Sequence, residues 1–208
     1  MRKMLAVLLS LLVSVTCYGD APQRGLDIVD VSFMSLTPAA VRLLEARERG
    51  DKEIVLNFDS PGGDIKAMFA FAALMRHVEL GGTKVVCVVH GMAASAGLYL
   101  LEMCDERIGV EGSIYLAHEV SVAEAGGKPA DLEKTAKMMR DLTHTMMVQM
   151  AARMLIPVEE LERRTHDTDY WFDYREALKI GAIDRVMTRA EAMKYGIVAP
   201  KEEYPPAL

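Results

Sequence analysis

Two apolar runs, each ending at a glycine-rich turn, constrain the fold more than any other feature of the sequence. Residues 54–58 (Ile-Val-Leu-Asn-Phe) lead into Ser-Pro-Gly-Gly-Asp, and residues 84–90 lead into Gly-Met-Ala-Ala-Ser-Ala-Gly. A segment of helical length, 65–77, lies between them. Short β-branched runs that alternate with helices are typical of a parallel sheet covered by helices. We therefore expect an α/β fold.

The rest of the chain continues this alternation. We expect further strands at residues 26–33, 107–110, 114–117, 170–172 and 182–186. Thr37 and Pro38 predict the start of the first helix, with threonine as the N-cap and proline at the first helical position. A long helix is expected from Pro129 to near Met154. Because nothing between these elements reads as a linker, residues 20–208 are predicted to form a single domain.

Charge and composition exclude some functions. The 208 residues include 24 Lys and Arg and 30 Asp and Glu, for a net charge of −6, and no basic run stands out. Phosphate binding needs clustered cations, so nucleic acid is not an expected partner. No group of His, Cys and Asp has the spacing of metal ligands, and we expect neither a metal nor a cofactor.

The N-terminus reads as an export signal. Arg2 and Lys3 precede an apolar run, residues 4–15, and small residues stand at Cys17 and Gly19 before a plausible cleavage site. We predict a signal peptide over residues 1–19 and a periplasmic or secreted protein. An uncleaved membrane anchor is the alternative, although the run is short for a span of roughly 20 residues.

Two cysteines, Cys87 and Cys104, would remain in the exported chain. Export permits a disulfide between them. The sequence favours two small buried hydrophobic residues over the disulfide, because it does not give the geometry that a disulfide requires.

Ser95 is the strongest candidate for a chemical role. It lies in the small-residue segment 91–97, between a predicted strand and a predicted helix. Small neighbours leave its Oγ accessible, and the free N–H groups of a helix N-terminus face any developing negative charge. The paired glycines of loop 59–64 could supply another N–H. A tightly packed helix start and an ordinary turn are the alternative interpretations.

Loop 59–64 resembles the Ser-Pro-Gly-Gly loop of Clp-peptidase-like proteins, and segment 91–97 resembles their nucleophile segment. The two occur in the same order along the chain as in that family, which has the ClpP/crotonase fold. The similarity covers roughly residues 45–186 and includes 114–118, 168–172 and 176–184. It implies a βαβ superhelix with a parallel sheet flanked by helices and a protruding handle helix. It also implies a serine peptidase related to the ATP-dependent Clp proteolytic subunit.

The resemblance assigns a role to each matching residue. Ser95 would be the nucleophile, His118 the general base, and Asp169 the group that orients the imidazole. Gly63 and Ala96 would form the oxyanion hole through their backbone N–H groups. The aspartate rests on the weakest match, and Asp167 is its competitor.

The resemblance also implies partners. We expect a homo-oligomer, because the handle helix, which is rich in methionine here, lies at an oligomer contact in the family. Export would separate the chain from cytoplasmic ATP, so no ATPase partner is expected. Peptides and unfolded polypeptides are then the predicted substrates.

Two other functions remain open at this point. One is a Ser-Lys enzyme of the signal-peptide-peptidase A type, in which Lys128 would be the base. The other is a non-catalytic scaffold or binding protein that kept the fold.

Overall fold

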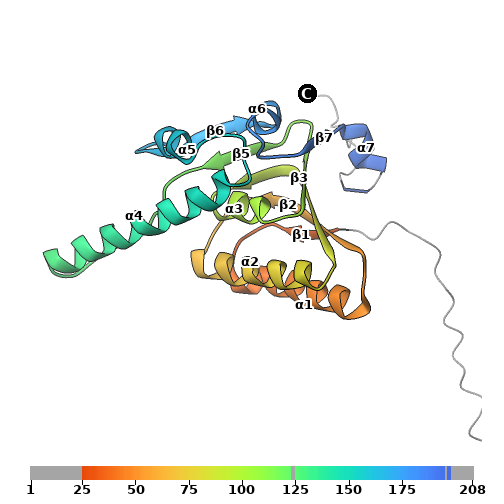
Figure 1. Ribbon diagram of the computed structural model, residues 1–208, viewed down its shortest axis with the longest axis horizontal. Helices are drawn as coiled ribbons and strands as arrows, with labels where there is room; N and C mark the ends of the chain where they lie inside the picture. The colour runs from red at the N-terminus through yellow and green to blue at the C-terminus, as the bar shows by residue number, and fades with distance from the viewer. Residues whose placement is uncertain (1–24, 123–124, 195, 198–208) are drawn as a thin grey trace, which may run out of the picture.

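The computed structural model describes residues 25–122, 125–194 and 196–197 (Figure 1). Seven strands form one sheet, with β1 to β4 and β7 in the order β1-β2-β3-β4-β7 and with β5 joined to β3 and β6. The strands are β1 (Leu26–Ile28), β2 (Glu53–Ser60), β3 (Lys84–Ala94), β4 (Glu106–Val110), β5 (Ile114–Ala117), β6 (Tyr170–Asp173) and β7 (Arg185–Met187). All pairs are parallel except β5–β6. The expected α/β fold with a parallel sheet is confirmed.

Helices cover the sheet. They are α1 (Phe33–Arg49), α2 (Ile65–Leu80), α3 (Ala96–Glu102), α4 (Pro129–Ala151), α5 (Val158–Thr165), α6 (Tyr174–Lys179) and α7 (Arg189–Lys194). Helices α1 and α2 lie side by side under the sheet, and the N-terminal half of α4 projects away from the body (Figure 1). The protruding helix implied by the resemblance is therefore present.

The first helix begins earlier than the sequence pattern predicts. Its N-cap is Ser32, whose Oγ accepts a hydrogen bond from the Ser35 N–H at 3.2 Å, so the helix starts at Phe33. Pro38 therefore lies inside the helix, and Thr37 donates its hydroxyl to the Phe33 carbonyl instead of capping. The strand predicted at 26–33 is shorter in the structure, where β1 covers Leu26–Ile28, because residues 29–32 lead into the N-cap of α1.

The main core lies between the sheet and helices α1, α2 and α3. Its largest fully buried side chains include Phe58, Met68, Leu98, Leu100 and Tyr115. The core packs directly against the turn between β3 and α3, since every residue of α3 is buried. The helix that follows β3 is thus fully enclosed.

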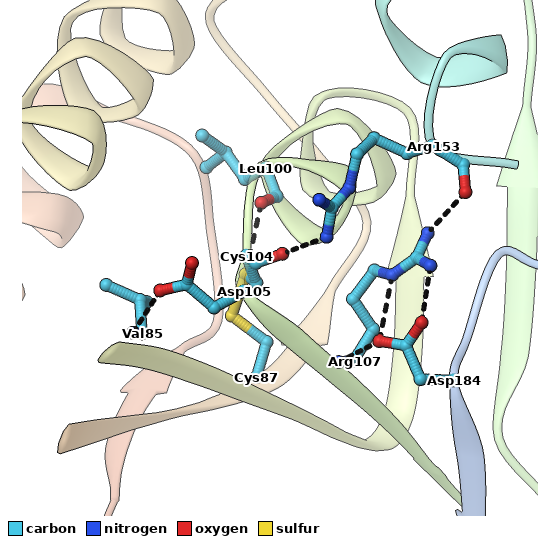
Figure 2. The surroundings of a disulfide bond; sticks show 8 residues. All are labelled: Val85, Cys87, Leu100, Cys104, Asp105, Arg107, Arg153 and Asp184. Atoms are coloured by element: carbon cyan, nitrogen blue, oxygen red, sulfur yellow. Dashed lines mark hydrogen bonds and ion pairs between the residues drawn. A yellow bond between two sulfur atoms is a disulfide. The ribbon is translucent and has the colours of Figure 1, made fainter. Parts of the chain in front are cut away.

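A disulfide joins Cys87 on β3 to Cys104 just after α3, with the two Cα atoms 6.1 Å apart (Figure 2). The sequence left open whether these two cysteines are disulfide-bonded or free, and in the structure they are bonded. The bond closes a ring of chain that contains all of α3 and the turn before it. Both cysteines are fully buried.

A buried ionic cluster lies next to the disulfide. Arg107 binds Asp184, with Nη2 and Oδ1 2.6 Å apart, and also binds the fully buried Glu102 (Figure 2 shows Arg107 and Asp184). Burial raises the pKa of the Glu102 carboxyl to about 8, although Arg107 opposes this rise. Arg153, which follows α4, donates to the Cys104 carbonyl at 2.6 Å. The cluster therefore ties the end of α3 to β4, to the end of α4 and to the residue before β7.

None of the helices in the described ranges is long and apolar enough to span a membrane. The predicted signal peptide, residues 1–19, and its cleavage site lie outside the described residues.

Candidate active site

Ser95 lies between the last residue of β3 and the first residue of α3. Its φ of 55° and ψ of −123° are sparsely populated for a residue with a side chain. The Ser95 N–H donates to the Leu116 carbonyl on β5 at 2.9 Å. Backbone strain of this kind persists only where the surrounding structure imposes it. Here β3, β5 and α3 impose it, and they present the Ser95 side chain at a sharp turn.

The Ser-Pro-Gly-Gly loop packs directly against this turn. A Cβ on Gly62 would lie 2.7 Å from the Ser95 Cβ and 2.8 Å from the Ala94 carbonyl oxygen, so only glycine fits. The loop is held on its other side by Val31, whose N–H donates to the Gly62 carbonyl at 2.9 Å. The glycine pair is therefore needed for the close approach of two backbone segments.

Two backbone N–H groups lie near the Ser95 side chain. Ala96 is the first residue of α3, and the N–H of a first helical residue has no partner within its own helix. Gly63 lines the same cavity as Ser95 and Ala96. This placement fits the oxyanion-hole roles that the sequence assigns to Gly63 and Ala96.

His118 contacts the candidate nucleophile directly. It follows the last residue of β5, and its Nε2 lies 2.7 Å from the Ser95 Oγ. The separation between the two residues is set by backbone pairing, because Ala94 of β3 is in register with Leu116 of β5. Ser95 and His118 therefore both lie just beyond a shared parallel ladder. The structure thus brings Ser95 and His118 together, and their roles as nucleophile and base stay predictions.

Asp169 lies near His118 in the backbone but is not joined to it. In the antiparallel β5–β6 pair, Ala117 is opposite Tyr170, so His118 and Asp169 are each one residue beyond the last pair. No hydrogen bond links His118 to Asp169 or Asp167 within the described residues. Asp169 is exposed, and Asp167 instead faces His166. The third member of the triad stays a prediction, and the register favours Asp169.

A small cleft, open to solvent, surrounds Ser95 and His118. Apolar side chains form most of one wall; they are Ile65, Met68, Leu98, Met146 and Met150. Met146 and Met150 come from the C-terminal half of α4, whose face toward the body is buried. Part of the methionine-rich helix thus lines the cleft, which the sequence pattern does not indicate.

Lys128 does not lie in this cleft. It is exposed at the N-terminus of α4 and is not among the cleft-lining residues. Of the two candidate bases, His118 is the one that contacts Ser95. His144, on α4, instead pairs with Glu162 at 2.6 Å.

The arrangement fits acyl transfer. With the proton of the imidazole on Nδ1, His118 Nε2 can accept the Ser95 hydroxyl proton while Oγ attacks a substrate carbonyl. The negative charge that develops on the carbonyl oxygen would face the N–H groups of Gly63 and Ala96. The leaving amine then takes the proton from His118, and water hydrolyses the acyl-enzyme by the same proton transfers.

Comparison with known proteins agrees with this geometry. The family model described as Clp protease matches residues 29–190, which is most of the chain and contains every site residue named above. The chain belongs to the Clp protease family. The suspected resemblance is therefore confirmed, and with it the class of the protein, a serine peptidase.

Two curated relatives are similar over much of their length. The ATP-dependent Clp protease proteolytic subunit 2 of Bifidobacterium longum is 31% identical over 157 residues, 73% of this chain and 72% of the relative. The ATP-dependent Clp protease proteolytic subunit 3 of Streptomyces avermitilis is 33% identical over 148 residues. That match covers 70% of this chain and 65% of the relative, so the chain spans just under two thirds of the second protein.

Proposed function

We propose that this chain is an exported serine peptidase that hydrolyses peptides or unfolded polypeptides without an ATP-driven unfoldase. The observation that carries the catalytic part is the 2.7 Å contact between His118 Nε2 and Ser95 Oγ at the edge of an open cleft. A serine in hydrogen-bond reach of a histidine, in a cleft that Gly63 and Ala96 also line, has the three parts that acyl transfer needs.

The cleft supports peptides with apolar side chains as substrates. The wall made by Met68, Leu98 and Met146 can desolvate an apolar side chain next to the bond that Ser95 attacks. Methionine side chains adapt to ligands of different shape. A preference for an apolar residue at the cleavage site, without a narrow choice among such residues, is the expected specificity.

Export is supported by two independent features. The sequence begins with a basic and then apolar segment of signal-peptide type. The buried disulfide between Cys87 and Cys104 is a bond that oxidising compartments favour and the cytoplasm disfavours. A protein placed there would not meet ATP, which is why we propose that it acts without the ATPase partner.

Assembly into a homo-oligomer is part of the proposal. Helix α4 projects from the body and exposes Leu132, Met138 and Val148 (Figure 1). Exposed apolar side chains along a helix that projects from the body are typical of an interface. The number of subunits would be measured by light scattering with size-exclusion chromatography.

The test of the catalytic proposal is labelling of the purified protein with a fluorophosphonate probe. We expect labelling of the wild type, none in Ser95→Ala, and a steep loss in His118→Ala. Lys128→Ala is the matched control and should label like the wild type.

Two results would redirect the assignment. Labelling that survives His118→Ala and is lost in Lys128→Ala would mean a Ser-Lys enzyme. A folded, oligomeric wild type that never labels would favour a non-catalytic protein with this fold.

A further inference from the structure

The active-site cleft has one carboxylate on a largely apolar lining. Among the described residues that line it, Glu119 and His118 are the only ones with an ionisable side chain. His118 contacts Ser95, whereas Glu119 takes no part in the proton transfers described above. Glu119 is thus the charged group that a bound substrate can contact without displacing His118 from Ser95.

Glu119 lies at the rim of the cleft, and its side chain is 44% exposed. It also lines a second hollow, whose other walls come from α4, α5 and the turn after α5. A residue that borders both hollows stands on the ridge between them. The backbone there is anchored, because the Val120 N–H donates to the Thr143 hydroxyl of α4 at 2.9 Å. The carboxylate is therefore held near the entrance of the cleft and stays accessible to solvent.

No lysine or arginine forms an ion pair with Glu119 within the described residues. Its ion pair there is with His166, whose Nδ1 lies 3.4 Å from Glu119 Oε1 and which is charged only when protonated. His166 also faces Asp167, with Nε2 and Oδ2 3.5 Å apart. A protonated imidazole between two carboxylates still leaves the three side chains with a net negative charge. This part of the rim therefore attracts a cation in either state of His166.

Two arginines line the second hollow, Arg140 on α4 and Arg163 on α5. Arg163 is bound by Glu160, with Nε and Oε2 2.9 Å apart. Arg140 forms no ion pair with Glu119 in the described part of the chain, and neither arginine lines the cleft. On the cleft side, the charge of Glu119 is left for a ligand to balance.

We propose that Glu119 is a specificity-determining residue that favours substrates with lysine or arginine close to the bond that is cleaved. The apolar stem of such a side chain can lie along the wall formed by Met146 and Met150, while its charged head reaches the carboxylate at the rim. An acidic side chain in the same place would meet a like charge. This specificity rests on the proposed peptidase function, and it narrows the substrates to peptides that carry an apolar and a basic residue together.

The preference should be modest, because Glu119 is half-exposed. An ion pair between exposed side chains corresponds to about a two- to fivefold change in an equilibrium constant. We therefore expect kcat/KM to be about two- to fivefold higher for a lysine peptide than for its glutamine counterpart. The difference should lie mainly in KM, since the ion pair forms before the chemical step. It should shrink at about 1 M salt, where charges are screened beyond about 3 Å.

The test uses the oligomer as purified and peptides of one apolar sequence, in which lysine, glutamine or glutamate occupies each of the two positions on either side of the cleaved bond in turn. At one or more of these positions, kcat/KM should fall in the order lysine, glutamine, glutamate. Glu119→Gln should remove the difference between lysine and glutamate, and Glu119→Lys should reverse it. A reversed preference cannot come from a loss of folding. Glu162→Gln removes a carboxylate of the same region that does not line the cleft, and it should keep the wild-type order.

Binding to Ser95→Ala separates this specificity from catalysis, because it needs no turnover. Measured by fluorescence anisotropy, the lysine peptide should bind about twofold or more tightly than the glutamate peptide, and adding Glu119→Gln should remove the difference. Equal binding of the two peptides, or a preference that Glu119→Gln leaves unchanged, would overturn the role of Glu119 even if the fluorophosphonate labels Ser95. A charge preference in binding by a wild type that never labels would support the role of Glu119 and refute the peptidase function alone.

Discussion

Ser95 and His118 meet at 2.7 Å, but the chain holds them by different means. Ser95 is flanked by buried residues on both sides, Ala94 and Ala96, and it lies within the ring closed by the Cys87–Cys104 disulfide. His118 is followed by a half-buried segment, and its expected partner Asp169 is exposed and unbonded among the described residues. The nucleophile is thus fixed by the core, whereas the base is fixed by one strand ladder.

Substitutions on the two sides of the site should therefore have different effects. Changes on the nucleophile side act through buried backbone and therefore affect folding as well as catalysis. Changes on the base side act through exposed groups and should affect catalysis alone. The following experiments test that division.

The largest effect is expected on the base side. Asp169→Asn should lower kcat by about 10²-fold or more, because His118 loses the group that orients it and stabilises its charged form. Asp167→Asn is the matched control and should change kcat little. Both variants should keep the wild-type melting temperature. A larger loss in Asp167→Asn would exchange the roles of the two aspartates.

On the nucleophile side, Gly62→Ala should lower kcat by about 10²-fold. The added Cβ would lie 2.7 Å from the Ser95 Cβ, and a displacement of about 1 Å at a reacting group has an effect of this size. Its φ of 102° also disfavours alanine, so the melting temperature should fall as well. Gly50 also has a positive φ, but a Cβ there would meet open space. Gly50→Ala therefore serves as the control for backbone strain alone. Equal kcat values for the two variants would contradict the packing argument.

Removal of the disulfide should come next in size. For a ring of about 17 residues, the loss of the bond lowers the free energy of unfolding by about 3 kcal/mol. In a chain of this length that corresponds to a fall in melting temperature of about 6–12 °C. Cys87→Ala with Cys104→Ala, compared with the wild type in calorimetry, measures it. An unchanged melting temperature would show that the core alone holds the nucleophile turn.

The last prediction concerns pH. The pKa of Glu102 is raised from 4.5 to about 8 in the folded protein, so between these values the native state keeps a proton that the unfolded state has lost. Its contribution to stability is therefore lost as the pH rises from about 4.5 to 8. Glu102→Gln cannot titrate, so its stability relative to the wild type should increase over this range. Urea unfolding at several pH values gives the comparison, and parallel profiles would mean that Arg107 keeps Glu102 ionised throughout.

The sequence predicts the parts of the site that depend on local pattern. Ser95, Gly63 and Ala96 lie in two glycine-rich segments after apolar strands, and the resemblance to the Clp peptidases assigns His118, which follows a third strand. Each position follows from where a strand stops. The parallel sheet follows from the same alternation of strands and helices.

Other features depend on distances that no local pattern contains. The disulfide requires Cys87 and Cys104 to approach across a whole helix, and that approach depends on how sharply the chain turns at Ser95. The start of α1 was predicted wrongly because Ser32 and Thr37 are both good N-caps, and packing of Leu36 into the core decides between them. The contact between Glu119 and His166 joins residues 47 positions apart, which sequence spacing does not reveal.

The shared ladder of β3 and β5 has a consequence for how the chain can vary in length. Successive side chains of a strand point to opposite faces, so one residue added between Ile114 and Ala117 would turn His118 away from Ser95. Residues added between Ser121 and Lys128 would leave this register untouched. The contact between Ser95 and His118 therefore depends on the number of residues in β5. We expect the chain to accept insertions after that strand but not within it.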